Sequence, residues 1–313
     1  DVLLDGHSHS LIEQEAVKNK DGEDVLLAAC GTKLQGIGYL RIAQDGTLST
    51  GLYQWNNDVA LPELLGLEND VATAVNEAVA ALDEKLGEVV AKTAVDLVIN
   101  ADAYRDQSGA DIAFVNGGGV RVSIDAGDIT LNDILLVHPF GNAMCVVEAT
   151  GQQILDALEW GARVVPEENG GFLHVAGASY EIHADIPNTV QTDEKNVWIG
   201  SATGTPRVQN VKIYNKASGT YEPLDETKTY ALAGMNYTLR NLGDGFAMFD
   251  GAELIKDYVS EDYLVMSTYA MTFGGVDAEG LPHLTTANSP LADYPGYLLD
   301  YENPYGAGRI SIL

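Results

Sequence analysis

A long amphipathic segment at residues 69–93 constrains the architecture most, because it divides the chain into two unequal parts. Apolar residues recur there at spacings of three and four among charged ones: Val71, Val75, Ala78, Leu82, Leu86 and Val89. This pattern predicts one long helix with a single apolar stripe. The helix follows the polar segment WNND and a break at Pro62. We therefore expect a linker at 56–92 between a domain fragment at 1–55 and a larger domain at 93–313.

The composition supports a folded protein. Of the 313 residues, 46% are hydrophobic and 20% are charged, which is enough apolar material for a packed core and argues against a disordered polyanion. A domain usually has ~100 to 200 residues, so two domains are the default for this length. The two cysteines, Cys30 and Cys145, lie in apolar segments. We expect them to be small buried hydrophobic residues, with no disulfide framework and no cysteine zinc site.

The charge restricts the choice of partners. Seventeen Lys and Arg residues against 46 Asp and Glu residues give a net charge of −29. Nucleic-acid affinity depends on Lys and Arg side chains that neutralise phosphates, so we expect no nucleic acid polymer as a partner. Small anionic ligands remain candidates, because charges are screened within ~10 Å at ordinary salt. No apolar run is long enough to predict a transmembrane segment. The sequence begins at Asp1 rather than Met, so the lack of a signal peptide there decides nothing about export.

Short strands and isolated helices predict an α+β fold with a mixed sheet. In the first part, strands are expected within 1–10, at 24–30 and in a hairpin at 37–49 that turns at Asp45-Gly46. After residue 93, helices are expected at 101–109, at 261–273 and after two capping signals, Thr130 with Asp133 and Thr150 with Gln153. Strands are expected at 111–115, 172–184, 208–215, 229–236 and 308–313.

Two histidines, His7 and His9, follow an apolar run in the segment DGHSH. Alternate residues of an extended segment point the same way, so both imidazoles can bind one metal ion. A pair of this kind also occurs at protein surfaces, and two ligands leave a zinc-type or two-metal site incomplete. The remaining four histidines are expected to be packing or surface residues: His138, His174, His183 and His283.

The segment NGGGVR at 116–121 is the sharpest local feature. Three glycines after a buried strand let the backbone approach a ligand or turn with positive φ, while Asn116 and Arg121 supply an amide and a guanidinium beside it. A tight structural turn would give the same pattern. The segment is not a phosphate-binding loop of the Walker type, because the Lys-Ser/Thr pair is absent, and its spacing is not that of dinucleotide-binding proteins.

Two loops carry aromatic residues. Phe172 follows two glycines and precedes a strand, and Tyr237 precedes the turn that contains Asp244. Opposed aromatic faces can hold a nucleobase, with stacking worth ~1 to 3 kcal/mol per base. A loop carboxylate such as Asp244 can accept both hydroxyls of a ribose. Taken singly, each aromatic residue is better explained as part of the core, and spacing does not show whether the two rings meet.

These segments together resemble the 5'-nucleotidase family, which includes UDP-sugar hydrolases and 2',3'-cyclic-nucleotide phosphodiesterases. The resemblance rests on five segments in this order: DGHSH, NGGGVR, GDITLNDILLVHPFGNAMCVVEATGQQILDALEWGA, GGFLHVAGASYEI and NYTLRNLGDGF. It implies a C-terminal substrate-specificity domain at 93–313. It also implies that 1–55 is the end of a metallophosphoesterase domain of α/β/β/α architecture, followed by the linker helix.

The resemblance also implies roles for individual residues. Asn116 with Gly118 and Gly119 would approach the base, and Arg121 would reach the ribose and phosphate. Phe172 and Tyr237 would stack on the base, and Asp244 would hold the ribose hydroxyls. His7 and His9 would match the last metal-ligand motif of a two-metal centre.

The chain departs from the family pattern in three respects. The other metal ligands of the family lie upstream of the residues present here, so we expect the chain as given to be inactive and to retain no metal. The Arg and the Glu-Asn-x-Gly-Asn-Leu helix start that precede the ADAY segment in the family are absent, since Asn100 runs directly into Ala101. Tyr237 and Asp244 are seven positions apart, one more than usual, which makes Tyr237 the less secure stacking residue.

The sequence therefore predicts the nucleotide-binding part of a metal-dependent phosphohydrolase, extracellular, periplasmic or on the cell surface, that releases phosphate from nucleoside 5'-phosphates or related nucleotides. In the full-length protein the cofactors would be two divalent ions of the zinc or manganese class, and the partner a small nucleotide or nucleoside. The alternative is a non-catalytic module that binds nucleotides or small anions. Base preference, metal identity and oligomeric state are left open.

Overall fold

The computed structural model describes residues 2–6, 10–32, 36–54, 70–95 and 101–313. These residues form two compact units, 1–81 and 82–313, with helix α2 (Asp70–Leu86) running across the division in the sequence. The predicted boundaries at 55 and 92 remain a prediction, since part of the intervening segment lies outside the described residues.

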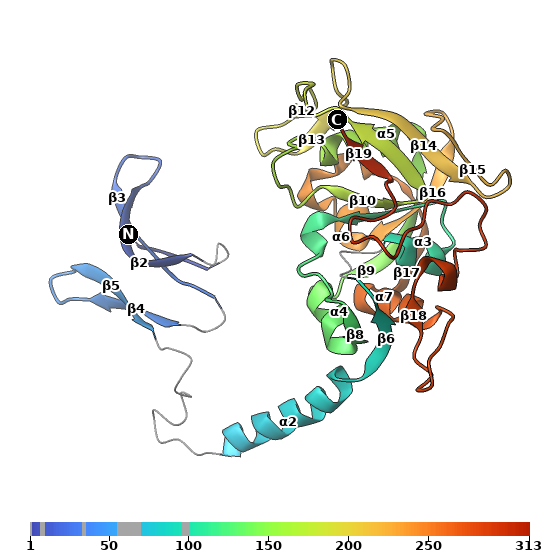
Figure 1. Cartoon of the computed structure of the whole chain (residues 1–313). Helices are drawn as coiled ribbons and strands as arrows, with labels where there is room; N and C mark the ends of the chain where they lie inside the picture. The colour runs from blue at the N-terminus through green and yellow to red at the C-terminus, as the bar shows by residue number, and fades with distance from the viewer. Residues whose placement is uncertain (1, 7–9, 33–35, 55–69, 96–100) are drawn as a thin grey trace. The chain divides into compact units, whose positions relative to one another are not determined.

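The described residues of the N-terminal unit form two small sheets (Figure 1). In the three-stranded sheet, β1 (Val2–Asp5) is parallel and β2 (Leu11–Lys18) antiparallel to the central strand β3 (Asp24–Cys30). The second is the predicted hairpin of β4 (Gly36–Ile42) and β5 (Leu48–Gln54). The hairpin turns at Gly46, which has φ +85°, so the turn prediction is confirmed. Strand β2 was not predicted.

The long helix is shorter than predicted. It ends at Leu86, and residues 89–93 form strand β6 (Val89–Thr93) instead of helix. The helix ends just before Gly87, whose amide makes the last i→i−4 bond, to the Asp83 carbonyl at 2.9 Å. The paired valines that follow favour an extended backbone. The prediction of helix to residue 93 was therefore wrong.

A five-stranded mixed sheet is the centre of the C-terminal unit (Figure 1). Its strand order is β10 (Leu173–Ala176), β7 (Ile112–Asn116), β16 (Thr229–Met235), β9 (Ala143–Thr150), β17 (Glu253–Glu261). Strands β7 and β16 are parallel, while β10 is antiparallel to β7 and β9 is antiparallel to β16.

Three smaller sheets complete the described part of this unit. The first has the order β15 (Thr220–Pro223), β14 (Val208–Asn215), β11 (Ala178–Ile182), β19 (Ile310–Ile312). The second has the order β18 (His283–Leu284), β6, β8 (Gly127–Thr130), and the third pairs β12 (Gln191–Thr192) with β13 (Trp198–Gly200). The predicted strand at 172–184 is thus two strands, separated at Gly177 with φ +74°.

The predicted helices of this unit form near their predicted positions, whereas the short helix α6 (Asn236–Leu239) was not predicted. The predicted ones are α3 (Ala101–Ser108), α4 (Leu131–Val137), α5 (Gly151–Gly161) and α7 (Asp262–Met271), with single 3-10 turns at Gly117–Gly119, Gly243–Gly245, Ala247–Phe249 and Thr286–Asn288. Both predicted capping boxes form, at Thr130 with Asp133 and at Thr150 with Gln153. Gly109 ends α3 with φ +74°, as predicted.

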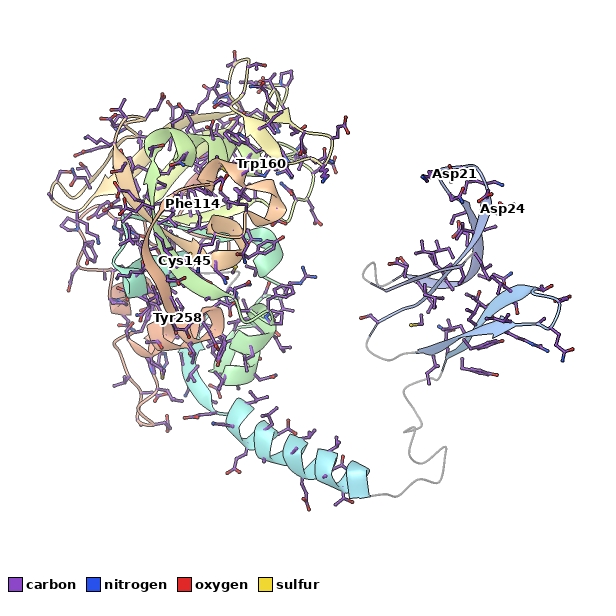
Figure 2. The ribbon with its side chains drawn as sticks, turned by 180° about the vertical axis from the view of Figure 1, so that it is seen from behind. Asp21, Asp24, Phe114, Cys145, Trp160 and Tyr258 are labelled. Atoms are coloured by element: carbon purple, nitrogen blue, oxygen red, sulfur yellow. The ribbon has the colours of Figure 1, made fainter. Side chains whose placement is uncertain are left out.

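The central sheet is covered on both faces. Along β7, Ile112 and Phe114 pack with α5 and the β11–β14 sheet, whereas Ala113 and Val115 pack with α3 and α7. This alternation follows from the two-residue period of a strand and explains why every residue of β7 is buried. Figure 2 shows Phe114, Cys145 and Trp160 inside the unit, with Tyr258 on the edge strand β17. The α+β prediction is confirmed, and Cys145 is buried as expected, whereas Cys30 is exposed.

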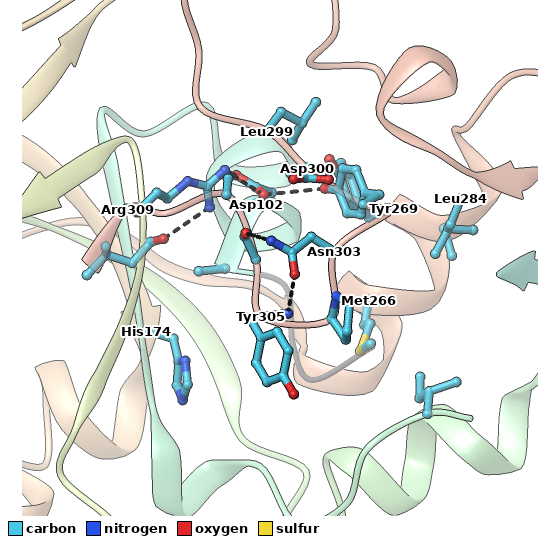
Figure 3. Close-up of a pocket in the computed structure, with 18 of the residues that line it drawn as sticks. Asp102, His174, Met266, Tyr269, Leu284, Leu299, Asp300, Asn303, Tyr305 and Arg309 are labelled. Carbon is cyan, nitrogen blue, oxygen red and sulfur yellow. Dashed lines mark hydrogen bonds and ion pairs between the residues drawn. The ribbon is translucent and has the colours of Figure 1, made fainter. Parts of the chain in front are cut away.

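The C-terminal segment is fixed to α3 by a buried ion pair. Arg309 Nη2 lies 2.8 and 2.9 Å from the two carboxylate oxygens of Asp102, and the Tyr297 hydroxyl donates to the same carboxylate at 2.6 Å. Figure 3 shows Asp102 and Arg309 facing each other beside Tyr269. Removing either charge would leave its partner buried and uncompensated.

Candidate functional site

Three loops that carry predicted site residues meet at one edge of the central sheet. Strands β7 and β16 are parallel, so both end at this edge, with Asn116 after β7 and Tyr237 after β16. Strand β10 is antiparallel to β7 and pairs Leu173 with Asn116, so it begins at the same edge, directly after Phe172. The topology therefore brings together residues that are up to 121 positions apart.

The glycine segment forms a single 3-10 turn bonded to the loop before β10. The amide of Gly117 donates to the Phe172 carbonyl at 2.7 Å, and that of Gly118 donates to the Gly170 carbonyl at 2.8 Å. A Cβ on Gly118 would lie 3.2 Å from the Gly170 Cα, and one on Gly119 would lie 2.7 Å from Met235 Cε. None of the three glycines has positive φ. Close backbone approach, not left-handed geometry, is therefore the reason for glycine here.

Asp244 is the centre of the polar contacts at this edge. Its carboxylate accepts hydrogen bonds from Asn116 Nδ2 at 3.0 Å and from the Tyr237 hydroxyl at 2.9 Å. Its amide donates back to the same hydroxyl at 3.2 Å, and its carbonyl accepts from Trp160 Nε1 at 2.9 Å. Desolvation and the bond to Asp244 raise the pKa of Tyr237, so the phenol remains a neutral donor.

The turn that holds Asp244 has an unusual backbone. Leu242, Asp244 and Gly245 have φ of +56°, +54° and +81°. Positive φ is uncommon for leucine, and it persists only where the surroundings fix it. Here the bond from the buried Trp160 indole and the ring of Tyr237 hold the turn in place. The turn thus presents the Asp244 carboxylate in a fixed orientation.

Arg121 lies beside the glycine turn with most of its donors unused among the described residues. Its Nη1 donates to the Gly118 carbonyl at 3.3 Å, and its guanidinium carbon is 5.7 Å from the centre of the Phe140 ring. The side chain is exposed. Its remaining N–H groups are available to an anion or a hydroxyl near the turn.

Phe172 is half-buried and borders an open cleft of about 660 Å³. The cleft is also lined by Gly117, Gly118, His174 and the loop at 165–170. The ring meets His174 edge-on at 5.6 Å between centres. Phe172 is thus accessible as a flat surface next to the glycine turn, as a stacking residue must be.

The sequence analysis missed three residues of this region. The Trp160 indole donates a hydrogen bond to the Asp244 carbonyl, and the Arg163 guanidinium stacks on the Trp160 ring. Gly243 contacts the Tyr237 ring so closely that a Cβ on this glycine would lie 2.3 Å from Cζ of the ring. The sequence signal for Trp160 and Arg163 was the segment WGAR at the end of a predicted helix, where a tryptophan is indistinguishable from a core residue. The signal for Gly243 was its place in the GDG turn.

One of the histidines expected to be packing residues supports the glycine turn. His138 is 2% exposed and its ring lies next to the backbone of Gly119. Burial lowers the pKa of His138 from 6.5 to about 4, so the ring is neutral near pH 7.

The metal-ligand prediction is not tested by the structure. His7 and His9 lie outside the described residues, and the described part of the chain contains no group of three or more His, Cys, Asp or Glu residues placed to hold a metal ion. The described residues therefore do not fit a two-metal centre. Among them there is also no helix long and apolar enough to cross a bilayer.

A second cavity, of about 330 Å³, lies beneath the C-terminal segment (Figure 3). Its lining combines apolar side chains such as Met266 and Leu284 with polar ones such as His174 and Asn303. The predicted substrate-binding residues do not line it.

The C-terminal unit is thus a mixed-sheet domain with a polar cluster at the shared end of β7 and β16. Residues 70–251 match the family described as "5'-nucleotidase, C-terminal domain", and the chain belongs to this family. The family predicted from the sequence is thereby confirmed.

Relatives and solved structures agree with this assignment. The trifunctional nucleotide phosphoesterase protein YfkN of Bacillus subtilis is 30% identical over 88% of this chain and 19% of its own length. A 5'-nucleotidase of Vibrio parahaemolyticus is 35% identical over 51% of this chain and 25% of its own length. The chain thus spans about a fifth to a quarter of these relatives. A Thermus thermophilus 5'-nucleotidase precursor structure has a TM-score of 0.60 at 23% identity, with 100% of this chain and 59% of that chain covered. A putative 5'-nucleotidase structure from Staphylococcus aureus has a TM-score of 0.64 at 17% identity, with 100% of this chain and 56% of that chain covered. Both structures show the same fold as this chain.

Proposed function

We propose that the chain is the nucleotide-binding, substrate-specificity part of a metal-dependent phosphohydrolase of the 5'-nucleotidase type. The observation that carries this proposal is the Asp244 carboxylate, held at the sheet edge by Asn116 and Tyr237 at 3.0 and 2.9 Å. A fixed carboxylate can accept hydrogen bonds from both hydroxyls of a ribose, and an accessible ring such as that of Phe172 can stack on a base.

We keep the residue roles that the family resemblance implies. Asp244 would accept the ribose hydroxyls, and Phe172 and Tyr237 would contact the faces of the base. Arg121, whose guanidinium is exposed beside the Gly118 carbonyl, would donate to the ribose or phosphate. Asn116 would orient Asp244 and approach the base together with Gly118 and Gly119.

Hydrolysis needs groups that the described residues do not supply. Two divalent ions would polarise the phosphoryl oxygens and generate a hydroxide for in-line attack. We assign that step to a longer protein that contains a complete metallophosphoesterase domain, in which His7 and His9 would be two of the ligands. The expected location is extracellular, periplasmic or on the cell surface, and the expected substrates are nucleoside 5'-phosphates or related nucleotides.

Titration calorimetry with AMP, adenosine and UDP-glucose tests the binding function on this chain. We expect saturable binding of at least one of them, and a loss of ~1.5 to 3 kcal/mol in binding free energy for Asp244→Asn, which removes a charge-assisted acceptor. Asp293→Asn, an exposed aspartate outside the site, is the matched control and should bind normally. If none of the three ligands binds, the proposal is wrong.

The enzymatic part needs a second measurement. A full-length parent should hydrolyse AMP in the presence of Mn²⁺ or Zn²⁺, and a chelator should abolish the reaction. Binding without hydrolysis by the parent would instead support the non-catalytic nucleotide-binding module.

A further inference from the structure

Arg163, just after helix α5, is a cation at the candidate site to which the sequence analysis gave no role. Its guanidinium carbon lies 3.8 Å from the centre of the Trp160 ring, and its Nη1 donates to the Trp160 carbonyl at 2.8 Å. Stacking on a fully buried tryptophan fixes the guanidinium in place. The side chain is half-buried.

This arginine lacks a carboxylate partner among the described residues, where its hydrogen bond to Trp160 is its one polar contact. Burial lowers the pKa of Arg163, and the charge of Asp244 opposes that shift without forming an ion pair. A guanidinium has five N–H donors, so the bond to Trp160 leaves most of them free. Partly desolvated donors without acceptors are unfavourable unless a ligand or water supplies those acceptors.

The position of Arg163 relates it to both loops that would hold a nucleoside. A Cβ on Gly171, the residue before Phe172, would lie 3.5 Å from Arg163 Nη1. On the other side, the Trp160 ring beneath the guanidinium bonds to the Asp244 carbonyl and lies 2.8 Å from where a Cβ on Gly245 would be. Arg163 therefore lies against the loop that precedes Phe172, and the tryptophan on which it stacks contacts the Asp244 turn.

A base that stacks on Phe172 would have its edge toward the Arg163 guanidinium, a group that can only donate hydrogen bonds. Hypoxanthine and guanine have two adjacent acceptors, O6 and N7, which match the parallel N–H groups of a guanidinium. Adenine has an amino group in place of O6, so this amino group and one guanidinium N–H would both be hydrogen-bond donors that face each other. The same arginine thus attracts one class of purine and disfavours the other.

We propose that Arg163 is a specificity-determining residue that makes the site prefer 6-oxopurine nucleosides, such as inosine and guanosine, over adenosine. This inference rests on the proposed nucleoside-binding function. It adds the base class, which neither the family assignment nor the fold specifies.

Calorimetry of the whole chain with inosine and adenosine tests the proposal. We expect the wild type to bind inosine about tenfold more tightly than adenosine, the discrimination typical of a bidentate contact to a base. Arg163→Met should lower the inosine affinity to that for adenosine while changing the adenosine affinity less than about twofold. Arg163→Lys keeps the charge without the fork and should retain only part of the preference. Lys228→Gln, which removes an exposed cation, is the control for net charge and should behave like the wild type.

The outcomes separate this inference from the function on which it rests. Equal binding of both nucleosides by the wild type, or an unchanged preference in a folded Arg163→Met variant, would overturn the role of Arg163 and leave the binding function intact. Should Arg163→Met not fold, Arg163→Lys decides, and a full preference there would also overturn the role. If the wild type binds neither nucleoside, the inference fails, and the proposed function fails as well only if AMP and UDP-glucose do not bind either.

Discussion

Replacement of Gly243 by alanine should displace Tyr237 from the candidate site. The new Cβ would lie 2.3 Å from Cζ of the Tyr237 ring, whereas ordinary contacts begin at 3.4 Å, so the ring must retreat by roughly 1 Å. That movement breaks the reciprocal bonds between the Tyr237 hydroxyl and Asp244, now 2.9 and 3.2 Å long. Tyr237 is 39% exposed and can turn toward solvent. Folding should therefore survive the substitution.

The expected effect is on binding. Loss of one stacking face removes ~1 to 3 kcal/mol, which corresponds to a ~5- to ~150-fold weaker Kd. Titration calorimetry with AMP measures the change, and thermal unfolding checks that the variant is folded. Gly274→Ala is the matched control, because its Cβ would meet an ordinary contact of 3.7 Å. A folded Gly243→Ala variant with wild-type affinity would show that Tyr237 is not part of the binding site.

Three further predictions concern charge and pH. Arg121→Ala should weaken AMP binding by ~1.5 to 3 kcal/mol in calorimetry with little change in Tm, and unchanged affinity would remove Arg121 from the site. Asp102→Asn should lower the free energy of unfolding by ~3 to 5 kcal/mol in urea titrations, because Arg309 then remains buried without its partner, and a loss below 1 kcal/mol would contradict this. Burial lowers the pKa of His138 from 6.5 to about 4, so on acidification the unfolded chain binds a proton before the folded chain does. The contribution of the neutral ring to the free energy of unfolding is therefore fully present above pH 6.5 and decreases as the pH falls toward 4. The wild type should thus lose on the order of 2 kcal/mol of unfolding free energy between pH 8 and pH 5. His138→Gln should lose less in the same urea titrations, and an equally steep profile would count against the assignment.

Local sequence signals predicted the elements that local chemistry determines. The capping boxes at Thr130 and Thr150, the stop at Gly109 and the turn at Gly46 all depend on residues within a few positions of one another. The extent of the long helix was not predictable in this way. Residues 89–93 continue the predicted helical segment, but in the structure they form β6 and pair with β8 and β18. Partners distant in the sequence therefore decide the structure of these five residues.

The candidate site divides in the same manner. The segments around Asn116 and Asp244 were recognisable one by one, yet the bond between their side chains joins residues 128 positions apart. Only the parallel order of β7 and β16 brings them together. Arg163 was not predictable, because its role depends on a tryptophan that the sequence cannot distinguish from a core residue.

The glycine turn restricts how this site can meet a negatively charged ligand. The amides of Gly117, Gly118, Val120 and Arg121 already donate to the carbonyls of Phe172, Gly170, Gly117 and Val137. Phosphate-binding loops work by directing consecutive free amides at the oxygens of the anion, an arrangement that these four amides cannot adopt while the loops stay joined. At this turn, attraction for a phosphate therefore depends on side-chain cations such as Arg121, in a chain that has only 17 Lys and Arg residues. Affinity for the charged part of a ligand should consequently depend steeply on ionic strength, whereas affinity for its uncharged part should not.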